Sequence, residues 1–219
     1  MKKILTIAAC MILLTCMAAT TSWASGGKVR GEKATGPAGD TGNGQVNTNR
    51  GGGTGDCCQA AENLSEIEVA HILYMRQEEK LARDVYLALY EYYNDAQDPL
   101  PTQIFSNIAA SEQRHMDALN RLVDFYGLDD LVSDDTPGVF ADSEDGFADM
   151  YEDLVARGMV GYCEALGVGI DIENLDIQDI EESLLDVEAP NVARVLNNLL
   201  AGSYNHLEAF TSRMTLTCP

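Results

Sequence analysis

Apolar side chains recur at alternating steps of three and four along several stretches after residue 63, which is the period of an amphipathic α-helix. No stretch alternates convincingly between apolar and polar residues, as a half-buried strand would. The pattern therefore predicts an all-α domain, and its four longest helices suit a bundle. The expected helices cover residues 64–93, 102–126, 146–157, 160–174, 177–185 and 190–214.

Local signals mark the ends of these helices. Ser65 can cap the first helix, and Glu68 completes a capping box with it. Gly127 follows the second helix, where a left-handed residue commonly ends one. Pro190 suits the first turn of the last helix, where its missing N–H costs nothing.

Two polar residues interrupt the apolar seam of the helix expected over residues 102–126. Glu112 and His115 stand one helical turn apart, among residues that should face a core. Burying an unpaired carboxylate there would cost several kcal/mol, whereas a shared metal ion would remove that penalty. The full seam is Phe105, Ile108, Glu112, His115, Leu119, Leu122 and Tyr126.

Three other helices show the same anomaly. Glu79 interrupts the seam of the first helix, and His206 interrupts that of the last. Glu173 lies on the inner side of the helix before, and Asp176 follows one turn later. Each of four helices thus offers an inward carboxylate, an imidazole or both, which is the composition of a dinuclear metal site in a bundle core.

Each of these residues also has a simpler interpretation. A lone histidine in a seam is more often a hydrogen-bonded core residue than a ligand, and Glu79 could form a helix salt bridge with Arg83. Glu78 lies on a neighbouring track, so we expect one of Glu78 and Glu79 to point inward and the other toward the flank. His71 shares a helix face with Glu78, but nothing else connects it with the site, and we leave it out.

Two motifs resemble the first half of the ferritin and rubrerythrin superfamily, namely Glu79-Lys-Leu-Ala-Arg-Asp-Val-Tyr86 and Glu112-Gln-Arg-His115. There the first helix gives a bridging Glu, and the second gives Glu-x-x-His. A fuller pattern is similar to an uncharacterised bacterial ferritin-like family, domain of unknown function 2202. This resemblance covers residues 64–214 and implies a ferritin-like four-helix bundle with additional short helices, while it implies the chemistry only by analogy. The fuller pattern comprises Phe105-Ser-Asn-Ile-Ala-Ala-Ser-Glu-Gln-Arg-His115 and Gly202-Ser-Tyr-Asn-His206-Leu.

The chain departs from the superfamily pattern in its last helix. Glu-x-x-His is expected there, but Ser203 stands three residues before His206. Asp176, three residues after Glu173, is our candidate for the missing carboxylate, with Glu78 in reserve. The expected metal ligands are therefore Glu79, Glu112, His115, Glu173, Asp176 and His206.

The resemblance implies that these residues bind iron, with two ions expected and manganese or zinc as alternatives, since imidazole and carboxylate ligands suit all three. With iron, we expect oxidation of Fe(II) or reduction of oxygen or peroxide by a di-iron oxidoreductase, with Tyr74 and Tyr86 nearby. One alternative is metal buffering or sensing without turnover. Ser203 and the lack of a rubredoxin-like Cys-x-x-Cys module favour it. Another alternative is a metal-free helical scaffold or partner-binding module.

The N-terminal part has a different character from the helical domain. Residues 1–24 have the features of a secretory signal peptide, with Lys2 and Lys3 before an apolar stretch, although a retained membrane anchor is the alternative. Residues 25–60 form a Gly-rich linker, which we expect to be a disordered tether. The helical domain covers residues 61–219, and we expect an exported protein, either periplasmic or extracellular.

The charge of the chain restricts its partners. It has 35 acidic and 14 basic residues, and removal of Lys2 and Lys3 with the signal would leave 35 against 12, a net charge of −23. A surface this negative argues against nucleic acid and anionic membranes as partners. We expect metal ions as partners, and a monomer or a homodimer because a tether on every subunit fits poorly with a closed cage.

Four cysteines remain after removal of the signal. Adjacent Cys57 and Cys58 rarely bond each other, which leaves two pairings with Cys163 and Cys218, and both would tie the end of the linker to the helical domain. Such a junction suits an exported protein. A metal or redox site at Cys57 and Cys58 is the alternative.

Overall fold

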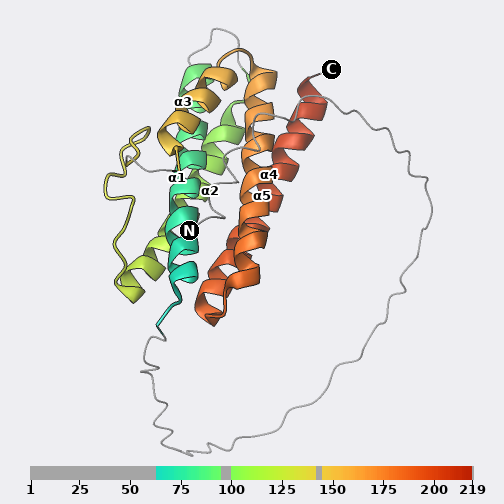
Figure 1. The fold of residues 1–219 in the computed structure, drawn as a ribbon. Helices are drawn as coiled ribbons and strands as arrows, with labels where there is room; N and C mark the ends of the chain where they lie inside the picture. The colour runs from blue at the N-terminus through green and yellow to red at the C-terminus, as the bar shows by residue number, and fades with distance from the viewer. Residues whose placement is uncertain (1–62, 95–99, 142–144, 219) are drawn as a thin grey trace, which may run out of the picture. The chain divides into compact units, whose positions relative to one another are not determined.

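The computed structural model describes residues 63–94, 100–141 and 145–218, and within them it contains five helices and no strand (Figure 1). The all-α prediction is therefore confirmed. The predicted signal segment and the predicted linker, with Cys57 and Cys58, lie outside the described residues. The helices are α1 (Glu66–Asn94), α2 (Gln103–Tyr126), α3 (Phe147–Gly158), α4 (Tyr162–Asp186) and α5 (Pro190–Thr217).

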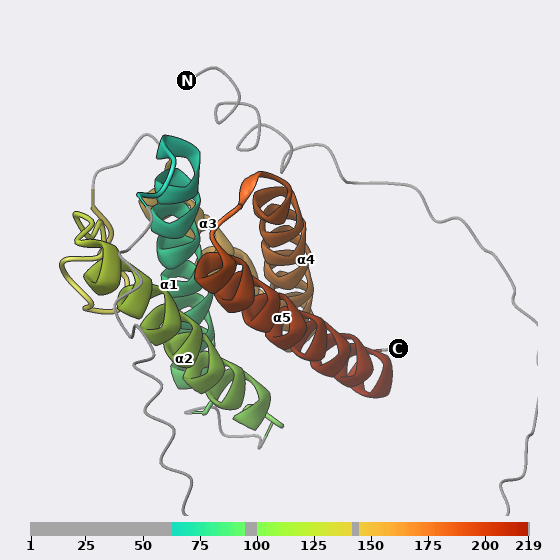
Figure 2. The ribbon, with the colours of Figure 1, turned by 90° about the horizontal axis from the view of Figure 1, so that it is seen from below.

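The four long helices form two closely packed antiparallel pairs. α1 packs along α2, and α4 packs along α5. Contacts of α1 with α4 and of α2 with α5 join the two pairs into a bundle (Figure 2). Residues 127–161 make one long connection from α2 to α4, and this connection includes α3, which packs across α1 and α4 near one end. The predicted helical bundle is thus confirmed.

The interior of the bundle has two apolar layers with a polar layer between them. The first apolar layer gathers around Tyr86, Phe105 and Phe210, and the second around Met75, Leu119 and Leu196. Along every long helix, the residues between these layers are polar, and all of them are buried except His115, which is half-buried. Apolar packing on both sides shields this polar layer from water. Its members are Glu78, Glu79, Glu112, His115, Glu173, Asp176, Ser203 and His206.

The start of α1 confirms the predicted capping box. The Ser65 amide donates to Glu68 Oε2 at 2.9 Å, and the Glu68 amide donates to Ser65 Oγ at 3.3 Å. Glu68 also has a role that its local sequence does not reveal, because its Oε1 accepts the amides of Glu188 and Ala189 at 2.9 and 2.8 Å. One carboxylate therefore satisfies donors at the starts of both α1 and α5.

The prediction of two helices over residues 160–174 and 177–185 is wrong, because α4 runs unbroken from Tyr162 to Asp186. The predicted break follows Asn174, but the side chain of this residue donates to the carbonyl of Ile170 one turn back at 2.7 Å, inside a continuous helix. Ile172, Ile177 and Ile180 keep the buried face continuous through this region. Tertiary packing therefore outweighs the weak local helix propensity.

The expected disulfide pairings are also wrong. Cys163, at the start of α4, is bonded to Cys218, just after α5, with their Cα atoms 5.8 Å apart. α4 and α5 are antiparallel neighbours, so these two helix ends meet although 55 residues separate them. The bond closes the open end of the α4–α5 pair rather than anchoring the linker.

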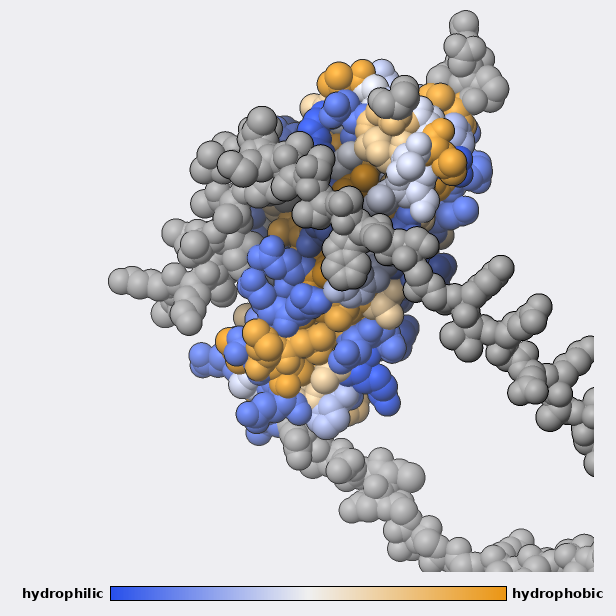
Figure 3. Space-filling view, turned by 90° about the vertical axis from the view of Figure 1, so that its right-hand side faces the viewer, coloured by the Kyte–Doolittle hydropathy of each residue, from blue (hydrophilic) through white to orange (hydrophobic). Residues whose placement is uncertain are grey.

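Among the described helices, none combines the length and the apolar character that crossing a bilayer requires. On the face drawn in Figure 3, apolar side chains lie among charged and polar ones. In the described part of the chain, the large apolar side chains with the highest exposure are Leu185, Leu216 and Val160, each near or beyond the end of a helix. Single exposed apolar residues of this kind are normal on a folded domain.

Candidate metal centre

Glu112 of α2 lies at the centre of the polar layer and faces both imidazoles. Its Oε2 lies 2.8 Å from His115 Nδ1, and its Oε1 lies 2.8 Å from His206 Nδ1. The two rings are 5.6 Å apart between centroids and inclined by 30°. The two oxygens of one carboxylate are therefore each directed at a different histidine, as in a carboxylate that bridges two ions.

A first group of three ligand-type side chains forms between α1 and α2. Glu79 Oε2 lies 3.1 Å from His115 Nδ1, on which Glu112 also converges. One ligand atom from each of Glu79, Glu112 and His115 lies within 4.8 Å of the others. The predicted juxtaposition of the motifs on the first two long helices is therefore present.

A second group repeats this arrangement on the other side of Glu112. Glu173 Oε2 from α4 lies 3.4 Å from His206 Nδ1 of α5, and one ligand atom of each also lies within 4.8 Å of one from Glu112. The Tyr86 hydroxyl donates to the other oxygen of Glu173 at 2.7 Å, which fixes the orientation of the carboxylate. Helices α2, α4 and α5 supply this second group.

The donor atoms of both groups fit a bound metal ion better than they fit one another. Glu79 Oε1, Glu112 Oε1 and His206 Nδ1 are fully buried without a hydrogen-bond partner. His206 Nδ1 and Glu112 Oε1 are close, yet the angles between them do not fit a hydrogen bond. Two ligand atoms about 2.1 Å from one ion, at a right angle, would lie about 3.0 Å apart. The observed separations of 2.8 to 3.4 Å fit a shared ion as well as direct ion pairs, so the buried atoms without partners are what favours a metal ion.

Ser203 takes part in the layer by holding Asp176. Its hydroxyl donates to Asp176 Oδ2 and also to the Leu199 carbonyl one turn back at 3.0 Å. Asp176 Oδ1 is buried and has no hydrogen-bond partner. The position where the superfamily pattern has a carboxylate on the last helix is thus occupied by a serine that orients a carboxylate from α4.

The charges of Glu112 and the two imidazoles support each other. Burial alone would raise the pKa of Glu112, but the contacts with His115 and His206 outweigh it and lower this pKa to about 2. Burial alone would lower the pKa of His206, but Glu112 and Glu173 raise it to about 9. Glu112 and His206 are therefore both ionised at neutral pH in the absence of metal, and the same contacts raise the pKa of His115.

The compensation is smaller for Glu173 and Asp176. Burial and the charge of Glu112 raise the pKa of Glu173 to about 7, against the opposing contacts with His206 and Tyr86. Burial and the charge of Glu173 raise the pKa of Asp176 to about 8, against the hydrogen bond from Ser203. The layer therefore holds more carboxylates than two imidazoles can balance, and a bound divalent cation would relieve this excess.

A glycine makes room for one of the imidazoles. A Cβ atom on Gly202 of α5 would lie 2.5 Å from His115 Nε2 and 2.6 Å from its Cε1. No side chain larger than hydrogen fits at this position unless His115 moves. Gly202 thus lets α5 approach the ring closely, while the ring turns Nδ1 toward Glu79 and Glu112.

Both glutamates of the pair Glu78 and Glu79 are buried, with exposed fractions of 2% and 1%, so the expectation that only one points inward is wrong. The alternative salt bridge from Glu79 to Arg83 is also wrong, because Arg83 pairs with Asp84 and Asp135. A straight helix in a closed bundle faces several neighbours, so two adjacent positions can both be covered. Glu78 belongs to the polar layer but to neither of the two groups around Glu112.

The remaining predicted residues have different surroundings. His71 lies against Ser183 at 3.0 Å and near Asp186 at 3.6 Å, outside both groups. Tyr74 donates at 3.2 Å to Asp179, a residue that our sequence analysis missed. Asp179 follows Asp176 by three residues, and residues so spaced share a helix face, so the sequence could have indicated that Asp179 also points inward.

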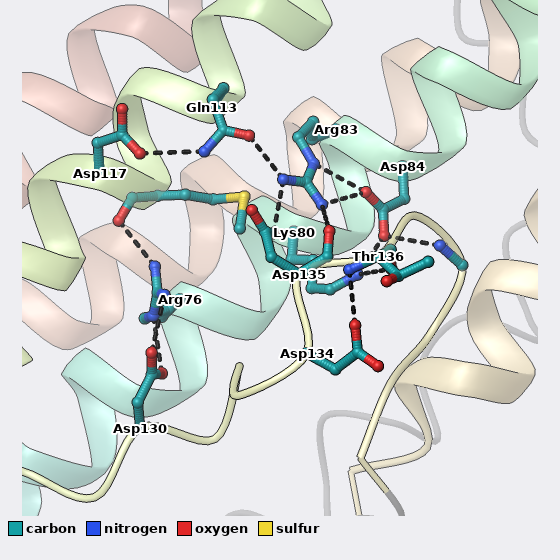
Figure 4. Close-up of polar contacts among 12 residues, drawn as sticks. Arg76, Lys80, Arg83, Asp84, Gln113, Asp117, Asp130, Asp134, Asp135 and Thr136 are labelled. Carbon is teal, nitrogen blue, oxygen red and sulfur yellow. Dashed lines mark hydrogen bonds and ion pairs between the residues drawn. The ribbon is translucent and has the colours of Figure 1, made fainter.

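A second buried polar region covers another side of α1 (Figure 4). Lys80 pairs with Asp84 and donates to the Thr136 carbonyl at 2.9 Å, and its ammonium lies 4.5 Å from the centre of the Phe140 ring. Arg76 makes a bidentate pair with Asp130, at 2.7 and 2.8 Å. These contacts attach the connection after α2 to α1.

The fold and the polar layer together define a helical bundle with a buried carboxylate and imidazole centre. The chain belongs to the family described as "Uncharacterized protein domain (DUF2202)", whose model matches residues 68–217.

A sequence comparison and a structure comparison both match one relative, MJ0754. An uncharacterised protein of Methanocaldococcus jannaschii, MJ0754, is 43% identical over 147 residues, which are 67% of this chain and 75% of that protein. A crystal structure of hypothetical protein MJ0754 from Methanococcus jannaschii matches with a TM-score of 0.65 and 42% identity, over 70% of this chain and 83% of that one. Neither name states an activity.

Proposed function

We propose that this chain binds two divalent metal ions, iron or manganese foremost and zinc as a third candidate, between α1, α2, α4 and α5. The observation that carries the proposal is Glu112, whose two oxygens each lie 2.8 Å from a different histidine in a layer shielded from water. Glu79 with His115 would hold one ion, and Glu173 with His206 the other. Asp176 would supply further negative charge through its free Oδ1.

The chemistry of the donor set supports this choice of metals. Carboxylates and neutral imidazoles suit Fe, Mn and Zn, and no thiolate that would favour copper lies among the described residues of the centre. When bound, an iron pair would supply electrons for the reduction of oxygen or peroxide while Fe(II) is oxidised. We therefore propose an oxidoreductase of the di-iron class, with metal buffering without turnover as the alternative.

The protein's own residues would prepare such a site in three ways. Tyr86 holds one oxygen of Glu173 by a hydrogen bond and leaves Oε2 directed at His206. Ser203 likewise holds Oδ2 of Asp176 by a hydrogen bond and leaves Oδ1 without a partner. The apolar layers on both sides exclude water and thereby strengthen the interaction of the carboxylates with a cation.

The connectivity of the bundle supports the ferritin-like resemblance. α2 and α4 are joined by one long connection, as in ferritin-like folds, whereas a simple up-down bundle has only short loops. We also propose that the protein is exported. The disulfide between Cys163 and Cys218 supports this, because such bonds persist in oxidising compartments.

The test is the metal content of the full chain, purified without a histidine tag and measured by elemental analysis. The wild type is expected to contain up to about two ions per chain, and His206→Ala is expected to lose at least one. His71→Ala is the matched control, because His71 is a partly buried histidine outside the centre. Absence of metal after reconstitution with Fe(II) and with Mn(II) would overturn the proposal in favour of a metal-free scaffold.

Turnover is tested separately on the same proteins. Fe(II) is added in the presence of oxygen or peroxide, and its oxidation is followed by absorbance. The di-iron proposal predicts faster oxidation with wild type than with Glu112→Gln or buffer. Reversible binding at the same rate of oxidation as in buffer would establish buffering instead.

A further inference from the structure

A second pair of buried carboxylates lies beside the metal centre. Glu78 has an exposed fraction of 2%, and neither of its side-chain oxygens has a hydrogen-bond partner. Asp179, with an exposed fraction of 4%, also has one oxygen without a partner, and the Tyr74 hydroxyl donates to its other oxygen at 3.2 Å. Buried oxygens without partners are costly, so this pair requires an explanation.

The described side chains offer this pair no positive partner. No lysine, arginine or histidine among the described residues lies within ion-pair distance of Glu78 or Asp179. Lys80, two residues along α1, is already paired with Asp84 on another side of the helix. Burial and the neighbouring carboxylates raise the pKa of Glu78, so without a cation a proton shared with Asp179 takes the place of a positive partner.

The pair is distinct from the centre around Glu112. Glu78 and Asp179 are absent from both groups of converging ligands. The neighbouring charges that act most strongly on Glu78 come from Asp176 and Asp179, and then from Glu79. The charge of Asp176 raises the pKa of Glu78, and the charge of Glu173 raises that of Asp176, so Asp176 interacts with both sets of carboxylates.

We propose that Glu78 and Asp179, with the hydroxyl of Tyr74, form a second cation site that takes a hard divalent ion such as Mn(II) or Mg(II). Its ligands are all oxygen, whereas the centre around Glu112 mixes oxygen with imidazole nitrogen. Hard ions prefer oxygen ligands and retain water molecules, so two carboxylates and one hydroxyl are a sufficient protein contribution. The site does not depend on occupation of the centre around Glu112.

The experiment is a titration of the full chain with Mn(II), in which free Mn(II) is measured by its electron paramagnetic resonance signal. Wild type is expected to bind one more Mn(II) per chain than Glu78→Gln or Asp179→Asn. Glu91→Gln is the matched control, because Glu91 is an exposed glutamate on the same helix and should leave the number unchanged. His206→Ala should lose Mn(II) from the centre and retain the extra ion.

Failure of this proposal is distinguishable from failure of the proposed function. If Glu78→Gln and Asp179→Asn bind as many ions as wild type while His206→Ala binds fewer, the second site is overturned and the centre stands. If His206→Ala binds as many as wild type and Glu78→Gln fewer, the opposite holds. Binding of no Mn(II) by any variant overturns both sites for this ion.

A competition experiment on the wild type avoids any dependence on variants that fold poorly. Excess Mg(II) should displace one Mn(II) per chain from the oxygen site and leave the ions held by His115 and His206, because imidazole is a poor ligand for magnesium. Glu78→Gln, if folded by circular dichroism, should release none. Release of no Mn(II) from the wild type would overturn the proposal.

Discussion

Two sides of α1 bury charged residues to a similar degree, but only on one side are these residues paired with opposite charges. On one side, Lys80, Arg83 and Asp84 have exposed fractions of 4% or less, and with Asp135 their charges balance. On the other side, Glu78 and Glu79 are as deeply buried, but three of their four side-chain oxygens have no hydrogen-bond partner. The first side is electrically complete without any ligand, and the second is not.

This difference shows which feature of a buried charge points to a ligand. Burial alone does not, because Lys80 is more deeply buried than His115 and its charge is fully accounted for by Asp84 and the Thr136 carbonyl. The informative feature is an excess of one sign together with donor atoms that lack partners. The paired side instead has a structural role, since it attaches residues 130–138 to α1.

The largest expected difference between the two sides is in stability without metal. Asp84→Ala removes the partner of both Lys80 and Arg83, so we expect the free energy of unfolding to fall by about 3–5 kcal/mol. Glu79→Gln should change it by less than about 1 kcal/mol, because burial and the charge of Asp176 already raise the pKa of Glu79 and favour its neutral form. Urea unfolding in EDTA measures both. Equal losses for the two variants would contradict the contrast.

Metal should stabilise the protein through the unpaired side alone. At 100 times the dissociation constant, Mn(II) or Fe(II) is expected to add about 2.7 kcal/mol and raise the melting temperature by roughly 5–10 °C. Glu112→Gln should abolish most of this rise, because Glu112 belongs to both groups of ligands. Asp130→Asn, on the paired side, should melt at a lower temperature but retain the full rise. An equal rise in Glu112→Gln would place the metal elsewhere.

The unpaired side should also make the metal-free protein less stable as the pH rises. The pKa values of Glu173 and Asp176 are raised to about 7 and about 8, so the folded state holds these protons more tightly than the unfolded state. The pKa of His206 is raised to about 9, and its contribution is complete below 6.5 and lost as the pH passes 9. All three effects have the same sign, so stability in EDTA should fall between pH 5 and 9.

Metal should reverse this trend, because ligands must lose their protons to bind it. The metal-induced rise in melting temperature should therefore grow from pH 5 to pH 8. Unfolding curves at several pH values, with EDTA and with Mn(II), measure both trends. A flat stability in EDTA over this range would contradict the charge excess assigned to the polar layer.

The smallest expected effect concerns the space beside His115. Gly202→Ala would place a Cβ atom 2.5 Å from His115 Nε2, so the ring must shift, and we expect metal affinity to fall about 10-fold. Gly167→Ala is the control, since the nearest atom to its Cβ would be Met214 Cε at 3.8 Å. The control should be slightly more stable and bind metal normally. Metal titration by calorimetry measures the difference, and equal affinities would show that the close contact does not orient His115.

The sequence was sufficient for every helix except α4, which it divided in two, and for the residues that converge on Glu112. The helical period fixed which positions face inward, and polar residues at those positions, such as His115 and His206, could be recognised by their contrast with apolar neighbours. Asp176 could also be chosen, because it follows Glu173 by one turn. The role of Ser203 as its hydrogen-bond donor depends on the approach of α4 to α5, which no local pattern contains.

Other features depend on contacts between distant segments and could not be predicted. The bond between Cys163 and Cys218 follows from the antiparallel packing of α4 and α5. The burial of Glu78 depends on how far α4 covers α1. The continuity of α4 through Asn174 reflects tertiary packing, which outweighs a local preference for a helix end.

The most direct test of the central claim is a crystal structure of the protein grown with Mn(II), with anomalous diffraction measured at the manganese edge. We predict one strong peak on each side of Glu112, one contacting Glu79 and His115 and the other contacting Glu173 and His206, in addition to the peak that the second cation site predicts at Glu78 and Asp179. A map without peaks in the polar layer, in which these side chains bond to one another and to water, would contradict the claim that the unpaired side of α1 is built to bind metal.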